Sequence, residues 1–160
     1  MEGETSYVEK ERFANLVVIY QHNMYRLALG ILRNKQDAED ALSETIVRAY
    51  EKRGILRDEN KFKAWIMTIL VNVSKNMLKR NSRLQLMEDV SAMEEAIQEN
   101  QNDVWSCVME LGELHRRIII LFYYEGFSTK EIAKIMKVPE GTVKSRLSRA
   151  RQQLKEIWDL

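Results

Sequence analysis

The chain has 160 residues, of which 45% are hydrophobic and 31% are charged, with a formal net charge of +1 at pH 7. One cysteine excludes an internal disulfide and a zinc or redox site of the CxxC type, and two histidines are too few for a histidine-based metal cluster, so we expect no metal and no cofactor. The sequence has no N-terminal signal and no run of about 18 apolar residues that would span a bilayer, so we expect a cytoplasmic protein.

Charge is distributed unevenly along the chain. Residues 81–103 hold one basic and six acidic side chains, which is typical of a linker. Residues 61–83 hold six basic side chains and no acidic one, and residues 137–155 hold six basic side chains beside one acidic residue, Glu140. Such stretches attract polyanions, although a solvated helix face explains either stretch taken alone.

Three helices are predicted in the first half of the chain. Ser6 and Glu9 fit a capping box for the first helix, residues 34–37 fit the start of the second, and Gly54 fits its end, followed by a loop to Asn60. Apolar residues keep helical spacing in each segment: Phe13, Leu16, Tyr20, Met24, Leu27 and Ile31; Ala38, Ala41, Leu42, Thr45, Ile46 and Ala49; Phe62, Trp65, Ile66, Ile69, Leu70, Val73 and Met77.

The residues after the acidic strip predict two further helices, at 104–111 and 113–125, broken at Gly112. The apolar run at 118–124 resembles a strand, but its flanking helical signals and Gly126 just past its end favour a buried helix. Few helix breakers in the whole chain favour an all-α fold. We expect two small helical domains, at 6–81 and 104–160, joined by a flexible acidic linker at 82–103.

Residues 128–154 fit a helix-turn-helix. Ser128 and Glu131 form a capping box that opens a short helix through about Met136, and Pro139 lies in the turn before a second helix from about Thr142. The inner positions are apolar: Ile132, Ala133, Ile135 and Met136 in the first helix, and Val143, Leu147, Ala150 and Leu154 in the second. Two amphipathic helices joined by so short a turn are typical of duplex-DNA binding proteins.

The outer face of this second helix is polar and basic. Because an α-helix fits the major groove, the side chains on that face are candidates for base contact: Lys144, Ser145, Ser148 and Arg149. Thr142, Arg146 and Arg151 are the candidates for phosphate contact. We call these seven residues the upstream set. A basic surface helix without a role in DNA binding is the alternative interpretation.

Three parts of the sequence resemble one family, the extracytoplasmic-function (ECF) sigma factors. Residues 125–133 and 139–151 resemble the promoter-binding region 4 of that family. Asp37-Ala38-Glu39-Asp40 followed by Glu44-Thr45 looks like region 2.2, and Phe62-Lys63-Ala64-Trp65-Ile66 followed by Asn72 looks like the end of region 2.3 and region 2.4. The resemblance covers nearly the whole chain, with the parts in the family's order.

The resemblance implies a transcription initiation subunit that has no catalytic activity of its own. Such a subunit binds core RNA polymerase, recognises the −35 and −10 elements of promoter DNA, and helps to melt the start-proximal element, so that it contacts both duplex and melted single strand. The family is typically held inactive by an anti-sigma factor, often at the membrane, and serves stress or envelope responses. No small-molecule substrate is expected.

The resemblance also gives roles to residues in the first half of the chain. Asp37, Asp40 and Glu44 fall on one helix face, which we call the acidic stripe, and correspond to the family's polymerase-binding region. A solvated helix N-terminus explains the same acids, and a carboxylate metal site lacks further ligands. The start-proximal set, which would contact the melted element and its backbone, comprises Arg57, Asn60, Lys61, Asn72, Lys75, Asn76, Lys79 and Arg80. Phe62 and Trp65 are expected in the core.

The sequence departs from the family's pattern at a few positions. Thr68 and Val71 stand where arginine is common, and Ser43 stands where glutamine is common. Lys137 occupies a turn position where glycine is usual, at a cost of about 1 kcal/mol if its backbone is left-handed. Cys107 fits a core thiol better than a redox sensor.

The sequence fits two other function classes less well than it fits a sigma factor. A helix-turn-helix regulator that binds duplex DNA without being a polymerase subunit would need a ligand pocket or a self-complementary face in its first 80 residues, where this sequence instead has the acidic stripe and a basic helix. An enzyme would need a nucleophile with its base, a metal set or a phosphate-binding loop, and the sequence contains none of these signatures.

Overall fold

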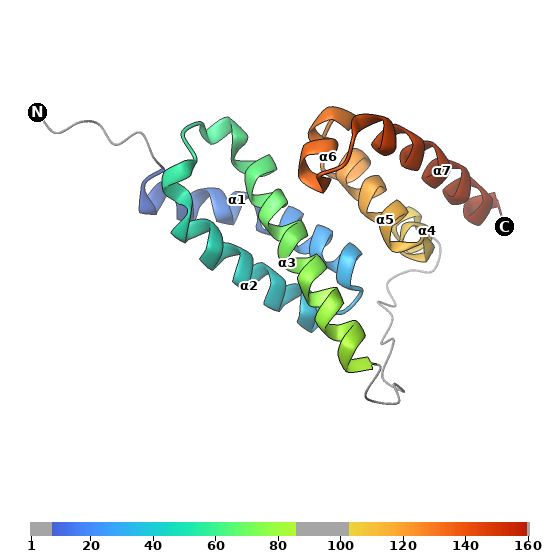
Figure 1. Cartoon of the computed structure of the whole chain (residues 1–160), viewed down its shortest axis with the longest axis horizontal. Coiled ribbons are helices and arrows are strands. Elements are labelled where there is room, and N and C mark those ends of the chain that lie inside the picture. The colour runs from blue at the N-terminus through green and yellow to red at the C-terminus, as the bar shows by residue number, and fades with distance from the viewer. Residues whose placement is uncertain (1–7, 86–102, 160) are drawn as a thin grey trace, which may run out of the picture.

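The computed structural model describes residues 8–85 and 103–159. In that part of the chain all regular structure is helical. Figure 1 shows two groups of helices: α1, α2 and α3 form an N-terminal bundle, and α4 to α7 form a C-terminal bundle that lies against α1 and α3. None of the described helices is long and apolar enough to cross a membrane.

The N-terminal bundle contains α1 (Lys10–Leu32), α2 (Lys35–Glu51) and α3 (Phe62–Gln85), with two short 3₁₀ turns, Arg53–Ile55 and Glu59–Lys61, between α2 and α3. Asn34 caps α2, because its side chain accepts a hydrogen bond from the Asp37 amide at 2.9 Å. The capping box predicted at Ser6 is not the start of α1. Ser6 lies outside the described residues, and the helix begins at Lys10, where the Glu9 side chain makes no capping hydrogen bond.

The ring of Phe62 lies at the centre of the N-terminal bundle. It is fully buried, as predicted, and its ring centroid lies 5.9 Å from that of Phe13 and 5.8 Å from that of Tyr20. Trp65, at 6.0 Å, packs on the same ring but remains partly exposed. Edge-to-face and stacked aromatic pairs at this spacing fix where α3 begins against α1.

The C-terminal bundle contains α4 (Val104–Glu110), α5 (Glu113–Ile119), a π-helical turn (Ile120–Tyr124), α6 (Thr129–Met136) and α7 (Glu140–Asp159). The apolar run is therefore helical, as predicted, and its last turn widens because the Glu125 amide bonds to the Ile120 carbonyl at 3.0 Å. Gly126 follows with a φ of 74°, the conformation that glycine adopts without strain.

The helix-turn-helix forms with the predicted capping box at Ser128 and Glu131. Lys137 adopts the left-handed conformation, with a φ of 56°. The second helix begins at Glu140, two residues before the predicted Thr142, because the Pro139 carbonyl already accepts the amides of the first helical turn. The predicted inner faces are buried at Ile132, Ile135, Met136, Val143, Leu147 and Ala150, and partly buried at Ala133 and Leu154.

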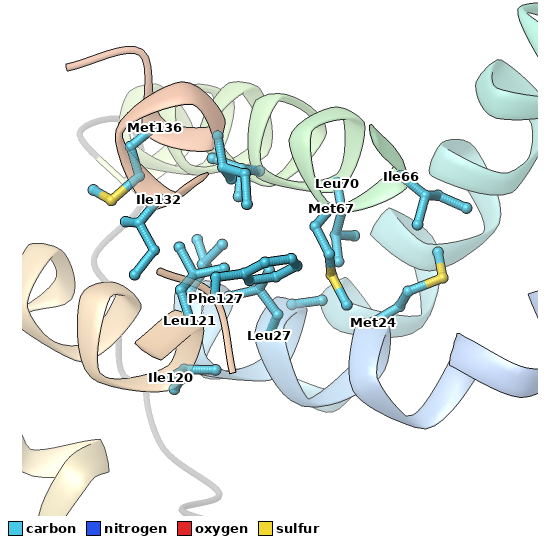
Figure 2. Close-up of a cluster of buried hydrophobic side chains, with 14 of the residues drawn as sticks. Met24, Leu27, Ile66, Met67, Leu70, Ile120, Leu121, Phe127, Ile132 and Met136 are labelled. Carbon is cyan, nitrogen blue, oxygen red and sulfur yellow. The ribbon is translucent and has the colours of Figure 1, made fainter. Parts of the chain in front are cut away.

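The two bundles share one hydrophobic core. Figure 2 shows Leu27, Met67 and Leu70 of the N-terminal bundle beside Leu121 and Phe127 of the C-terminal bundle, and all five side chains are buried. Between the bundles, α3 continues to Gln85, so the first residues of the predicted linker are helical. The last residue of the predicted linker, Asp103, caps α4, and residues 86–102 lie outside the described part of the chain.

Candidate nucleic-acid interface

The predicted base-contacting residues lie together on the outer face of α7. Lys144, Ser145, Ser148 and Arg149 are all exposed, while Val143, Leu147 and Ala150 are buried on the opposite side of the same helix. Lys144 Nζ lies 3.6 Å from the Glu140 carboxylate one turn away, an exposed pair that contributes little stability. Four polar side chains are therefore exposed together on one face of α7.

The predicted phosphate-contacting residues of α7 differ in their burial and in the residues that they contact. Arg151 donates from Nε to the Tyr123 hydroxyl at 2.6 Å, and its guanidinium lies 5.4 Å from the ring centroid of Phe122. Thr142 and Arg146 are partly buried. Arg151 is exposed like Arg149, but its guanidinium is held against the aromatic side chains of the π-helical turn.

Arg146 lines a groove between the bundles, together with Lys75 and Lys79 of α3. The groove has a volume of about 350 Å³ and is also lined by Leu78, Glu113, Leu114, Arg117, Met136 and Val138. Burial, followed by the charge of Arg117, lowers the pKa of Lys75. Burial and then the charge of Arg146 lower the pKa of Arg117 to about 10. The groove is thus a concentration of positive charge.

Arg117 is the most enclosed cation of this groove. It is 3% exposed, its guanidinium pairs with the Glu113 carboxylate, and its Nε has no hydrogen-bond partner. Sequence reasoning missed Arg117 because a cation in an apolar helix is ordinarily assigned to its exposed edge.

The start-proximal set extends along α3 from the loop that precedes it. Arg57, Asn60 and Lys61 are exposed in or beside the second 3₁₀ turn, where the Asp58 side chain accepts the Asn60 amide at 3.0 Å. Lys79 lies 18 residues beyond Lys61, which is about 27 Å along a helix. Of the remaining members, Asn76 and Arg80 are exposed, and Asn72 and Lys75 are partly buried.

Arg80 differs from the rest of that set because it faces the acidic stripe. Its guanidinium lies 3.9 Å from the Glu44 carboxylate, which also accepts a hydrogen bond from Arg48 at 2.7 Å. Asp37, at the other end of the stripe, accepts a hydrogen bond from the Asn81 side chain at 3.1 Å. Arginine side chains thus border the stripe at Glu44, and Asp40, its middle member, is exposed.

Sequence reasoning missed one charged cluster altogether. Glu125 is buried, and its carboxylate accepts hydrogen bonds from Asn23 at 2.7 Å and from Arg26 at 2.8 and 3.0 Å. Lys63 lies 3.4 Å from the same carboxylate and donates to the Glu125 carbonyl at 2.6 Å. We call Asn23, Arg26, Lys63 and Glu125 the Glu125 cluster. No local sequence pattern predicts this cluster, because its members are up to 102 residues apart.

Comparison with known proteins accounts for both bundles. Residues 16–84 match the family model for sigma-70 region 2, and residues 101–154 match that for sigma-70 region 4. The chain is 32% identical to the ECF RNA polymerase sigma-E factor of Escherichia coli, over 91% of this chain and 86% of that protein. It is 28% identical to the ECF sigma factor SigW of Bacillus subtilis, over 95% and 92% of the two chains.

The chain belongs to the ECF RNA polymerase sigma factor family.

A solved relative has the same fold across both bundles. It is the sigma factor RpoE in a complex with the anti-sigma factor NepR from Bartonella quintana, which is 26% identical to this chain with a TM-score of 0.79. The match spans 94% of this sigma factor and 98% of that chain. Since a superposition of one bundle alone would not reach such a score, the two bundles have a similar relative arrangement in both proteins.

Proposed function

We propose that this alternative sigma factor binds core RNA polymerase through the acidic stripe and recognises a two-part promoter with its two basic surfaces. The upstream set on α7 would read the −35 element as duplex. The start-proximal set on α3 and its preceding loop would hold the −10 element, including its melted strand. The protein contributes binding and positioning, and the polymerase contributes the catalysis.

The observation that carries this proposal is the separation of three polar surfaces on two bundles. The outer face of α7, which carries Lys144 and Arg149, is exposed. A second cationic surface follows α3, and the exposed Asp40 lies on the acidic stripe of α2. A regulator that only binds duplex DNA requires the first surface and gains nothing from the other two.

The two predicted domains, 6–81 and 104–160, fit this division of labour. We propose that the first holds the polymerase and the start-proximal element, and the second holds the upstream element. An anti-sigma factor is the expected inhibitory partner, by analogy with the relative solved in such a complex. The site of action is the cytoplasm, where core polymerase and promoters are found.

Binding to core polymerase separates the sigma factor from the duplex-binding regulator. The purified chain is mixed with core polymerase and run on a sizing column, and we expect the two to co-elute. Asp40→Lys should abolish co-elution, because it reverses a charge in the middle of the acidic stripe. Glu51→Lys, at an exposed position near the end of the same helix, is the matched control and should co-elute like the unmodified chain.

In a parallel measurement, the affinity of the same two variants for random-sequence duplex DNA is determined. Asp40→Lys should retain duplex binding, since α7 is unchanged. Duplex binding without any association with core polymerase, under conditions where another sigma factor associates, would contradict the proposal and favour the regulator.

A further inference from the structure

The groove between α3 and the C-terminal bundle gathers cations from three helices. It lies where α6 packs beside α3 (Figure 1), and its cationic lining comprises Lys75 and Lys79 of α3, Arg117 of α5 and Arg146 of α7. The acidic side chain in the lining is Glu113, which pairs with Arg117. We call this the cationic groove, because its described lining has three more cations than carboxylates.

Three of these four cations have no anionic partner in the described part of the chain. Lys75, Lys79 and Arg146 make no ion pair and no side-chain hydrogen bond there. Arg117 pairs with Glu113, but its buried Nε has no hydrogen-bond partner. Like charges gathered in a cleft raise the local positive potential and concentrate anions in it. The cationic groove thus has the charge and the unused donors that an anion site requires.

The cations of the groove also repel one another. Burial and then the charge of Arg117 lower the pKa of Lys75, while burial and then the charge of Arg146 lower the pKa of Arg117 to about 10. Arg117 therefore stays protonated at neutral pH, and the repulsion persists in the folded chain. A bound anion would replace this repulsion with charge-assisted hydrogen bonds, which are among the stronger hydrogen bonds in proteins.

The remainder of the lining is apolar and limits the kind of anion that fits. It comprises Leu78, Leu114, Met136 and Val138, and Leu114 is 43% exposed. The volume of about 350 Å³ is at the small end of small-molecule sites. Three unpaired cations in that volume match several negative charges on neighbouring atoms, as in a diphosphate or triphosphate, whereas a DNA strand carries one charge per about 3.4 Å. The organic part of such a ligand would cover the apolar wall, which an inorganic ion would leave in water.

We propose that the cationic groove binds a compact organic polyphosphate, of which a nucleoside triphosphate is the representative. Its phosphates would lie on Lys75, Arg117 and Arg146, and its organic part would lie against Leu114 and Val138. The exposed base-contacting face of α7 is not part of this site. The proposal does not depend on the proposed function, because its test contains neither DNA nor polymerase as the ligand under study. It adds that the polyphosphate and promoter DNA would compete for Lys75 and Arg146.

The experiment titrates ATP into the full chain and follows binding by isothermal titration calorimetry. Salt at about 150 mM screens attraction to exposed lysines more than attraction to enclosed cations, and Mg²⁺ is omitted because it would neutralise part of the triphosphate. We expect saturable binding of one ATP per chain. Inorganic triphosphate should bind about tenfold more weakly, because it leaves the apolar wall uncovered. Adenosine, which has no phosphate, should not bind measurably.

Four variants separate the groove from the general surface charge. Lys75→Gln and Arg146→Gln each remove one partly buried cation of the groove and should weaken ATP binding about tenfold. Lys134→Gln removes an exposed cation of α6 that does not line the groove, so it is the matched control and should bind ATP like the unmodified chain. Glu113→Gln removes the carboxylate from the lining and should tighten ATP binding. Circular dichroism verifies that each variant is folded.

Three results would overturn the proposal. The first is the absence of saturable ATP binding up to millimolar concentrations, and the second is an equal loss of affinity in Lys134→Gln and Arg146→Gln, which would mean attraction to surface charge alone. The third is inorganic triphosphate binding as tightly as ATP, which would exclude an organic ligand. In a parallel titration with a single-stranded oligothymidine, a loss in Lys75→Gln and Arg146→Gln that ATP binding does not share would assign these cations to the nucleic-acid backbone instead.

Discussion

The two basic surfaces of this sigma factor differ in what determines their accessibility. The outer face of α7 is exposed because its opposite face, with Val143 and Leu147, is buried within the same bundle. The cationic side of α3 is partly covered, because Lys75 faces a groove whose other wall is the C-terminal bundle. A helix packed by its own neighbours has a fixed surface, whereas a helix at a boundary has a surface that depends on whether the boundary is closed.

The largest expected effect concerns the buried side of α3. Phe62→Ala should lower the free energy of unfolding by about 3–5 kcal/mol, because it empties the centre of the aromatic cluster. Trp158→Ala, at a side chain that is 56% exposed at the end of α7, should change it by less than about 0.5 kcal/mol. Urea titration followed by circular dichroism gives both values, and a similar cost for the two would mean that the Phe62 ring does not lie at the centre of the N-terminal bundle.

A smaller effect separates the two surfaces by their DNA. Arg149→Ala should weaken binding to a duplex that carries a mapped upstream element by about 1–3 kcal/mol, whereas Lys79→Ala should leave that affinity nearly unchanged. Fluorescence anisotropy with the two variants in parallel provides the measurement. Equal losses in both would contradict the division of the promoter between the bundles.

In its described residues, each bundle has one non-glycine residue with a left-handed backbone in a turn between two helices, and the two turns can be compared. Lys137 has a φ of 56° in the helix-turn-helix, and Arg33 has a φ of 55° between α1 and α2. Replacing either residue with glycine should raise the stability by up to about 1 kcal/mol, because glycine adopts this conformation without a steric cost. Thermal unfolding should show a small increase in Tm for each variant. A decrease would mean that the side chain contributes more than the backbone strain costs.

The smallest effect concerns the salt dependence of binding to single-stranded DNA. Lys79→Ala should reduce the slope of log K against log salt concentration by about 0.7, the value for one lost phosphate contact. Arg149→Ala should leave the slope for the single strand unchanged. The reverse result would place the single strand on α7 and contradict the assignment of α3.

The sequence was sufficient for the helix-turn-helix and insufficient for the boundary between the bundles. The capping box at Ser128 and the burial of Val143 follow from local patterns, which report on residues only a few positions apart. The local pattern predicts the start of α7 at about Thr142, two residues after its actual start at Glu140, a difference typical of helix ends.

Contacts between residues far apart in the sequence could not be predicted, because no local sequence pattern indicates them. Gly30 gave no sign that α1 contacts the C-terminal bundle, and Glu125 looked like an ordinary acid at the end of an apolar run. The predicted set on α3 shares only its polarity, which does not distinguish Arg80, beside the acidic stripe, from Lys75 in the groove. The surroundings of Arg80 and Lys75 depend on tertiary packing, whereas the sequence pattern predicts only the helix on which both residues lie.

The most direct test of the proposed function is the mapping of transcription start sites made by core polymerase with and without this sigma factor on fragmented genomic DNA from its own organism. We predict a set of start sites that require the sigma factor and share two short upstream elements, and that disappear with Asp40→Lys. Start sites identical to those of core polymerase alone, obtained with a folded chain, would contradict the account.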